Sequence, residues 1–309
     1  MTRRFGSGPS GSDPIDRGLA WCRWAGWLLV ASGAVYAAIL GVQGGEWSGP
    51  LSLRKPLLFG LSTGVTALSL AWVGRGLAPL PGDGLLFRGL AVALVLEVGL
   101  IDLQQARGVP SHFNRESWLV SGAMTGLILA ATFAILYITG RALLRLDFRS
   151  DYRRAARAGL ALLVLGCGLG VLATVVGESR VDAGLPPERI GEAGVLKFPH
   201  GVPLHALQIL PLLVWGLEQL GVGLRARRRA VGCVAVSVLL ATLYALAQTF
   251  SGRGRFDPSL GGWVLFVAAG LLAASGALAI ALEGRTSGPE PAWSESGRSG
   301  RAAGRAPRR

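Results

Sequence analysis

Long apolar runs separated by short polar segments dominate the chain from about residue 24 to about residue 282. A bilayer core about 30 Å thick is crossed by about 20 apolar residues in helical form. Helix is the expected conformation because lipid offers the backbone no hydrogen-bond partners. The runs predict eight spans, at about 24–42, 56–74, 85–104, 117–140, 158–177, 202–224, 230–250 and 261–282. The predicted fold is therefore an all-α, polytopic transmembrane helix bundle.

Small residues recur within these predicted spans, as in Leu58–Gly64 and Gly166–Gly170. Gly, Ala, Ser and Thr let helix backbones approach closely in lipid, where no hydrophobic effect drives helices together. These two stretches predict close contacts between helices.

The remaining segments divide the chain into three parts. Residues 1–20 and 284–309 are rich in Gly, Ser, Pro and Arg, which predicts a disordered N-terminus and a disordered basic tail around a helical domain at 21–283. The first span is predicted to be retained, because its apolar run is longer than a signal-peptide core and Asp13 and Asp16 precede it.

Composition and charge support a membrane protein over a soluble one. Hydrophobic residues make up 51% of the chain and charged residues only 16%, against about 25% charged in soluble domains. The net charge of +13 does not indicate nucleic acid, because the arginines flank apolar segments and form no basic-aromatic platform. The lipid bilayer is the expected partner.

Basic residues also predict the orientation. With the N-terminus inside, the inside segments hold 22 Lys and Arg and the outside segments hold 9. Cytoplasmic loops carry the excess of these residues, so both termini are predicted to be cytoplasmic. The expected location is the cytoplasmic membrane of a bacterium.

Polar side chains gather toward the predicted outer ends of the spans. The third span carries Glu97 and Asp102, and Gln104, Gln105 and Arg107 follow at its exit. Acids at this depth cost about 2.5–3.5 kcal/mol on insertion scales near the helix centre and normally have a partner or face a cavity. Two interpretations stay open, a functional cavity and a structural ion pair with Arg107, Arg54 or Lys55.

The three histidines, His112, His200 and His205, all fall at the predicted outer boundary. His205 and Gln208 are neighbours on one helical face. Pro211 removes the hydrogen bond to the Leu207 carbonyl, which predicts a kink beside them.

Imidazole and carboxylate groups in this region could bind a transition metal or haem, and His112 with His205 is the pair to consider. The spacing of the histidines is not that of a known metal motif, so interfacial hydrogen bonding is the alternative.

Three stretches resemble a group of uncharacterised multi-pass membrane proteins of bacteria: Arg54–Ser62, Glu97–Asn114 and Pro199–Pro211. Their shared motifs are a Lys-Pro entry to the second span, a Gln-x-x-Arg-Gly…Ser-His-Phe-Asn loop and a Pro-His…Leu-His-x-Leu-Gln entry. The resemblance implies the same fold and membrane placement, but no activity. It singles out Lys55, Glu97, Gln104, Arg107, His112, Asn114, His200, His205 and Gln208.

Three functions remain open from the sequence. The first is an extracytoplasmic pocket that binds a metal, haem or quinone. The second is a proton-coupled transporter with Glu97 and Asp102 as the protonated groups. The third is a non-catalytic sensor or assembly factor with a small-molecule or membrane-protein partner. All three need Glu97, Arg107, His112 and His205 to meet at one outer opening.

Overall fold

The computed structural model describes residues 14–45, 47, 49, 51–114 and 117–283. Within these residues the helices are α1 (Pro14–Gln43), α2 (Arg54–Gly74), α3 (Asp83–Ala106), α4 (Trp118–Leu144), α5 (Ser150–Asp182), α6 (Lys197–Leu204), α7 (Ala206–Gln219), α8 (Leu224–Phe250) and α9 (Leu260–Glu283). Two short strands, β1 (Arg189–Ile190) and β2 (Gly194–Val195), form an antiparallel hairpin. The predicted tail at 284–309 and most of the predicted disordered N-terminus lie outside the described residues.

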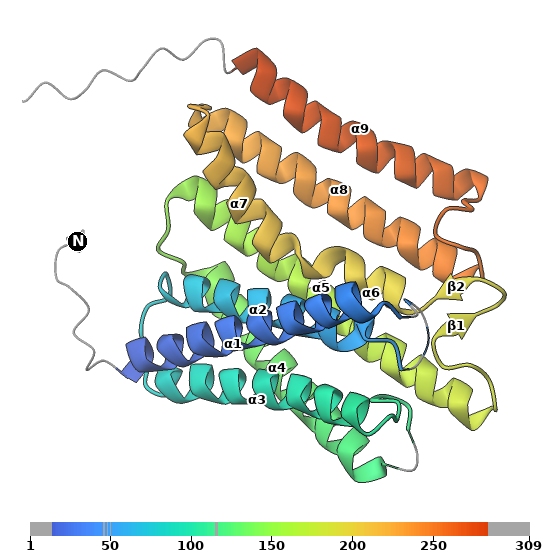
Figure 1. Ribbon diagram of the computed structural model, residues 1–309. Coiled ribbons are helices and arrows are strands. Elements are labelled where there is room, and N and C mark those ends of the chain that lie inside the picture. The colour runs from blue at the N-terminus through green and yellow to red at the C-terminus, as the bar shows by residue number, and fades with distance from the viewer. Residues whose placement is uncertain (1–13, 46, 48, 50, 115–116, 284–309) are drawn as a thin grey trace, which may run out of the picture.

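The predicted all-α transmembrane bundle is confirmed. Seven helical segments are long and apolar enough to cross a membrane, with α6 and α7 together forming one of them. The apolar helix α9 packs beside α8 (Figure 1). Each predicted span corresponds to one helix or to the α6–α7 pair. The chain therefore has the architecture of a multi-pass membrane protein.

The first helix begins earlier than the predicted domain boundary at residue 21. It starts at Pro14, with Asp16 in its first turn. Proline suits the first helical position because its missing N–H has no helical partner there, and an acidic side chain stabilises the positive end of the helix dipole. These local features extend α1 beyond its apolar run.

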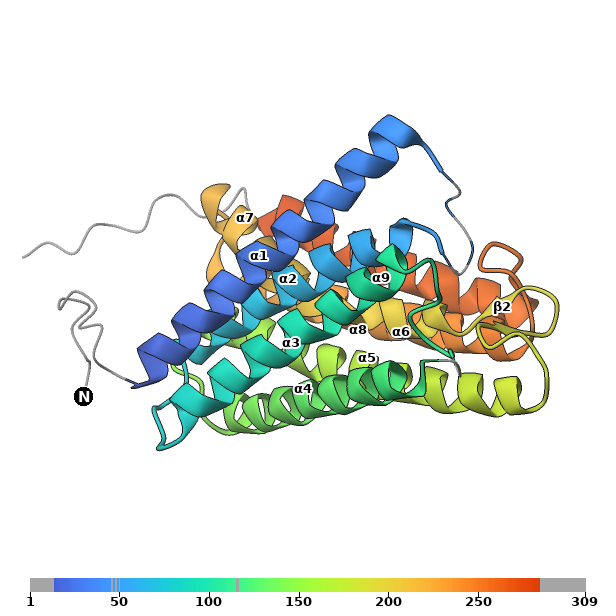
Figure 2. The ribbon, with the colours of Figure 1, turned by 60° about the horizontal axis from the view of Figure 1, so that its bottom comes forward.

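The arginine-rich loops lie at one end of the bundle, here called the inner end, which includes the start of α1. The hairpin β1–β2 lies at the opposite, outer end (Figure 1 and Figure 2). At the inner end, Asp83 is buried and forms an ion pair with Arg141, while Asp151 is buried beside Arg227 at 3.0 Å. These pairs join α3 to α4 and α5 to α8.

Glycines bring α1 and α2 into close contact. A Cβ atom placed on Gly60 would lie 2.8 Å from the Gly33 nitrogen, and one on Gly64 would lie 2.7 Å from the Gly26 carbonyl oxygen. Neither distance leaves room for a side chain. The predicted close approach of Leu58–Gly64 to another helix is thus observed.

The break in the sixth span lies at His205, where α6 ends and α7 begins. The His205 N–H bonds to the Pro203 carbonyl and leaves the helical pattern. Pro203 itself has no N–H to donate, which weakens the end of α6. Pro211 lies inside α7, and the kink predicted beside it stays a prediction.

The hairpin β1–β2 covers the outer end of α8. The Ala193 N–H donates to the Gly252 carbonyl at 3.0 Å, and the Thr249 hydroxyl donates to the Val195 carbonyl at 3.1 Å. The pattern of apolar residues did not predict this strand pair, because two residues per strand are too few to show alternation.

Candidate functional site

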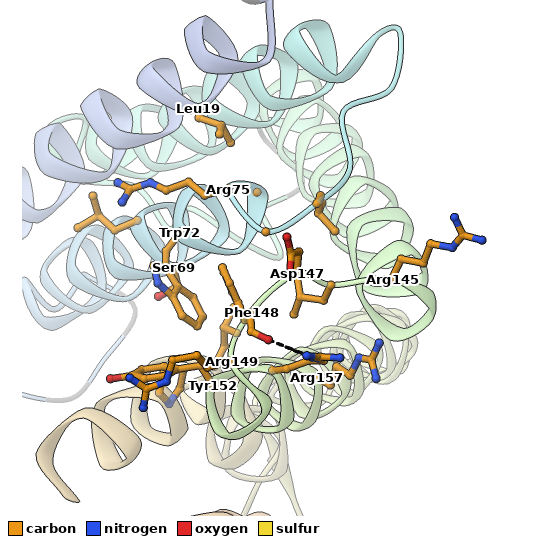
Figure 3. A pocket seen from close by; sticks show the side chains of 18 of the residues that line it. Leu19, Ser69, Trp72, Arg75, Arg145, Asp147, Phe148, Arg149, Tyr152 and Arg157 are labelled. Carbon is orange, nitrogen blue, oxygen red and sulfur yellow. Dashed lines mark hydrogen bonds between the residues drawn. The ribbon is translucent and has the colours of Figure 1, made fainter. Parts of the chain in front are cut away.

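A cavity of about 2410 Å³ lies between α2 and α7 and extends to the inner end. Its floor is made by the loops 75–79 and 144–149, which are joined by a hydrogen bond of 2.8 Å from the Asp147 N–H to the Gly76 carbonyl. Figure 3 shows the aromatic and charged side chains that line it. We call this cavity the α2–α7 groove.

The groove is closed toward the outer end by polar contacts between the two helices. His205 Nε2 lies 3.5 Å from the Ser62 hydroxyl, and the Gln208 amide donates to the Thr66 hydroxyl at 3.3 Å. The Gln208 Oε1 atom is buried and has no hydrogen-bond partner. A bound molecule with a donor group would satisfy this oxygen, because a buried unpaired acceptor costs about 1–3 kcal/mol.

The walls below these contacts are apolar. Val65 and Leu68 on α2 face Pro211, Leu212 and Trp215 on α7 across the groove. Leu212 and Trp215 are 63% and 55% exposed, so they are open to lipid in a membrane. The groove therefore offers an apolar surface that is continuous with the bilayer.

Aromatic rings gather where the groove reaches the inner end. Trp72 stacks on Phe148 with ring centroids 4.6 Å apart, and Tyr152 lies 6.3 Å from Trp72. The Phe148 ring fits against Gly76, where a Cβ atom would come within 2.6 Å of it. Tryptophan and tyrosine favour the membrane–water boundary, so this group marks the inner interface.

Charged residues at this mouth are mostly basic: the lining includes Arg75, Arg145, Arg149, Arg153 and Arg157 against Asp16 and Asp147. The excess of positive charge favours an anionic group at the mouth.

Some of these arginines are held by the fold. Arg149 forms an ion pair with Glu218 at 2.5 Å and lies 5.4 Å from the centre of the Tyr152 ring. Arg153 donates twice to the Phe148 carbonyl, at 3.1 and 2.8 Å. Arg157 donates to the Ala142 carbonyl at 2.8 Å.

Arg75 and Arg145 differ from the other three. Both are exposed, and neither side chain has a hydrogen bond or ion pair within the described part of the chain. Arg75 caps α2 beside Trp72, whereas the Arg145 side chain points away from the labelled aromatic side chains (Figure 3). Arg75 thus keeps its full donor capacity at the mouth.

His112 contacts the outer part of α2, beyond the groove. The His112 ring lies 5.7 Å from Phe59, one helical turn from Ser62 and its contact with His205. His112 Nδ1 also lies 2.9 Å from the Ser111 hydroxyl. Two of the three predicted histidines, His112 and His205, therefore lie along α2.

The positive charges near His112 oppose its protonation. Burial, followed by the charges of Lys55 and Lys197, lowers the pKa of His112 to about 3. Lys197 forms an ion pair with Glu188, and its charge holds the pKa of Glu188 below the usual value despite burial. His112 is neutral at pH 7.

The two acids of α3 lie apart from these charges. Glu97 is 3% exposed and its Oε2 atom has no hydrogen-bond partner. Asp102 accepts hydrogen bonds from the hydroxyls of Ser32, at 3.2 Å, and Tyr36 on α1. No ion pair joins either acid to Arg54, Lys55 or Arg107 where the structure describes the side chains. The predicted alternative of a structural ion pair is not observed.

The other predicted residues make local contacts. Arg107 donates to Gln104 at 2.9 Å, Gln105 donates to the Leu51 carbonyl at 2.8 Å, and Asn114 donates to the Pro110 carbonyl at 3.2 Å. His200 Nδ1 lies 2.7 Å from the Gly166 carbonyl. These bonds attach the outer loops and α6 to the bundle.

Of the eleven predicted site residues, only His205 and Gln208 line the α2–α7 groove. The convergence of Glu97, Arg107 and His112 with His205 on one outer opening stays a prediction. Sequence reasoning missed the inner mouth, although the chain carries a signal for it. Arg145, Arg149, Arg153 and Arg157 recur every four residues and have aromatic neighbours.

Metal binding finds limited support. Among the described residues, no group of three or more His, Cys, Asp or Glu side chains is placed to hold a metal ion. The pair His112 and His205 has only two ligands, and its role as a metal or haem site stays a prediction.

Comparisons with known proteins identify no relative. No family model, curated protein or solved structure matches the chain. The resemblance to bacterial multi-pass membrane proteins therefore stays a prediction, and function must be argued from the geometry of this chain.

Proposed function

We propose that this protein is a multi-pass membrane protein that binds a membrane lipid in the α2–α7 groove. The observation that carries the proposal is the combination of apolar walls with polar groups at both ends of one cavity. The volume of about 2410 Å³ exceeds the 300–1,000 Å³ of a typical small-molecule pocket. It has room for long hydrocarbon chains.

The lateral opening also favours a molecule that arrives from the bilayer. Leu212 and Trp215 are exposed along the groove, so a hydrocarbon chain can enter without crossing a polar surface. The contacts of Ser62 with His205 and of Thr66 with Gln208 stop it from passing further outward.

Filling the groove tests this proposal. Ser69 lines the cavity, and its hydroxyl bonds only within α2, to the Val65 carbonyl. Ser69→Trp places a large ring in the space and is expected to remove most of the co-purifying lipid, counted by native mass spectrometry. The matched control is Thr125→Trp, an exposed site on α4 with the same kind of intrahelical bond. Equal lipid retention in both variants contradicts the proposal.

A second candidate function is proton-coupled transport, and one observation favours it. Lys55, Ser62, Thr66 and Ser69 share a face of α2 that runs from the outer charges to the groove. These side chains provide a row of hydrogen-bonding groups that can pass a proton along much of α2.

Proton flux into proteoliposomes under an imposed membrane potential tests the second candidate. The expected result is flux through the wild-type protein that His205→Phe abolishes, because that change removes the contact with Ser62. Absence of flux in the wild type excludes the role. The proton flux through Glu97→Gln measures the contribution of α3, which carries Glu97, separately from that of α2.

The cofactor alternative has its own test. A metal, haem or quinone bound at His112 and His205 would appear in the absorption spectrum or metal analysis of the purified protein. A featureless spectrum without bound metal contradicts it. A non-catalytic sensor or assembly factor would be detected by crosslinking a partner from the loops at 105–116 and 178–201.

A further inference from the structure

We infer that the inner mouth of the α2–α7 groove binds the phosphate headgroup of an anionic phospholipid from the cytoplasmic leaflet. The inference rests on the proposed lipid-binding function and names the lipid class. Arg75 and Arg153 contact the phosphate, and the acyl chains lie along the apolar walls of α2 and α7.

Charge complementarity at the mouth carries this inference. Arg75 lies at the C-terminal end of α2 and Arg149 at the start of α5 (Figure 3), and Arg153, one turn further along α5, lines the same cavity. Guanidinium groups bind phosphate oxygens through paired N–H donors. The donors of Arg75 are unused in the described structure, and Arg153 spends Nε and Nη2 on the Phe148 carbonyl, leaving Nη1.

The aromatic group fixes the depth of the headgroup. Trp72, Phe148 and Tyr152 line the same end of the groove as these arginines. Tryptophan and tyrosine occupy the level of the lipid headgroups. A phosphate bound by Arg75 therefore lies at the level of the bilayer interface, and its chains reach Leu212 and Trp215.

The same arrangement selects a lipid over a free anion. A soluble phosphate would use the arginines and leave the apolar groove uncovered, whereas a phospholipid covers both. Burial of hydrocarbon contributes about 0.8 kcal/mol per CH₂ group relative to water, but a lipid already in the bilayer gains little from this term. Headgroup charge consequently decides which lipid occupies the groove.

Anionic headgroups are favoured over zwitterionic ones for the same reason. The mouth carries five arginines and two aspartates. A zwitterionic lipid would bring a cationic amine toward this excess of positive charge. Each basic residue near the surface attracts anionic lipid by about 1 kcal/mol, or about fivefold.

The inference is tested with the full-length protein in mixed micelles that contain phosphatidylglycerol and phosphatidylcholine in equal amounts. Native mass spectrometry counts the two lipids that remain bound. The wild type is expected to retain phosphatidylglycerol preferentially, and Arg75→Gln to reduce that preference about fivefold. Because Arg75 has no partner in the described structure, its replacement leaves the fold intact.

Arg225→Gln is the matched control. Arg225 is exposed and lies at the same end, in the first turn of α8, but it does not line the groove. It is expected to leave the preference unchanged within about twofold. Arg153→Gln should weaken the preference as Arg75→Gln does.

Four outcomes overturn the inference. Equal retention of the two lipids by the wild type removes the headgroup selectivity, and equal losses in Arg75→Gln and Arg225→Gln indicate only general surface attraction. An unchanged preference in both Arg75→Gln and Arg153→Gln removes the assigned site. Displacement of the lipid by inorganic phosphate at millimolar concentration identifies a soluble anion as the occupant.

Failure of the proposed function gives a different result. In that case Ser69→Trp leaves the retention of both lipids unchanged, whatever the arginine variants do. Loss of both lipids in Ser69→Trp, without any preference in the wild type, keeps the groove function and overturns only the headgroup assignment.

Discussion

At the scale of single residues, His112 illustrates how the fold changes the chemistry of a side chain. It lies in the outer loop beside Phe59, and burial together with Lys55 and Lys197 lowers its pKa from 6.5 to about 3. A neutral His112 packs well there, whereas a charged one would face two lysines. The folded conformation of this loop is therefore more stable at neutral or basic pH than at acidic pH.

Acidification is expected to destabilise this loop. The unfolded chain protonates His112 near pH 6.5, whereas the folded chain keeps it neutral to lower pH. The stability contributed at this site is complete above that pH and falls as the pH decreases. Between pH 7 and pH 5 the melting temperature should fall by about 4–8 °C, as expected for about 2 kcal/mol.

Thermal unfolding of the wild type and of His112→Gln at both pH values measures this effect. The variant should lose the part of the pH dependence that belongs to His112. His200→Gln is the comparison variant for His112→Gln, because it removes a different imidazole, which contacts the Gly166 carbonyl. A pH dependence that is the same in the wild type and His112→Gln contradicts the prediction.

Sequence reasoning located the polar residues better than their contacts. Helical spacing predicted that His205 and Gln208 are neighbours on one face, but not that both line the α2–α7 groove. The partner of Asp102 did not follow, because Ser32 and Tyr36 belong to α1 and are brought there only by packing. Contacts between distant helices leave no local pattern in a single sequence.

At the scale of elements, the contact between α1 and α2 depends on the absence of side chains. Gly60 faces the backbone of Gly33, and no movement of a flexible side chain can relieve a clash there. The apolar runs predicted where the spans lie, because bilayer thickness sets their length. They did not predict the break at His205, which depends on the local loss of helical bonding near Pro203.

Gly60→Ala is expected to destabilise the protein by about 1–3 kcal/mol, the usual cost of overpacking. The added Cβ atom would lie 2.8 Å from the Gly33 nitrogen, so α1 and α2 must separate. Unfolding in increasing denaturant measures the change.

Gly89→Ala on α3 is the matched control, because a Cβ atom there meets nothing within 4 Å. It should be neutral or slightly stabilising, since alanine favours helix over glycine. Similar losses in Gly60→Ala and Gly89→Ala would show that the α1–α2 contact is not as close as described.

At the scale of the whole molecule, the distribution of arginines predicts which end faces the cytoplasm. Glu192 lies in the hairpin at the outer end, and Leu220 lies in the α7–α8 loop at the inner end, where it is 78% exposed. In intact cells, a membrane-impermeant thiol reagent should label Glu192→Cys but label Leu220→Cys only after lysis. The reverse pattern contradicts the orientation.

The native cysteines Cys22, Cys167 and Cys233 lie within helices, and labelling of the wild type measures their background.

The inner mouth of the groove is also a feature of the whole molecule. Its arginines and aromatic residues come from α2, α5 and two loops, so only the assembled bundle makes it a site.

The contacts that join α2 and α7 near Ser62 and Thr66 give the groove a single direction of entry. Molecules in the outer half of the bilayer have no route into it unless they first change sides. Occupancy by the lipid that we propose would consequently report the composition of one monolayer, and an enzyme that altered the opposite monolayer alone would leave that occupancy unchanged.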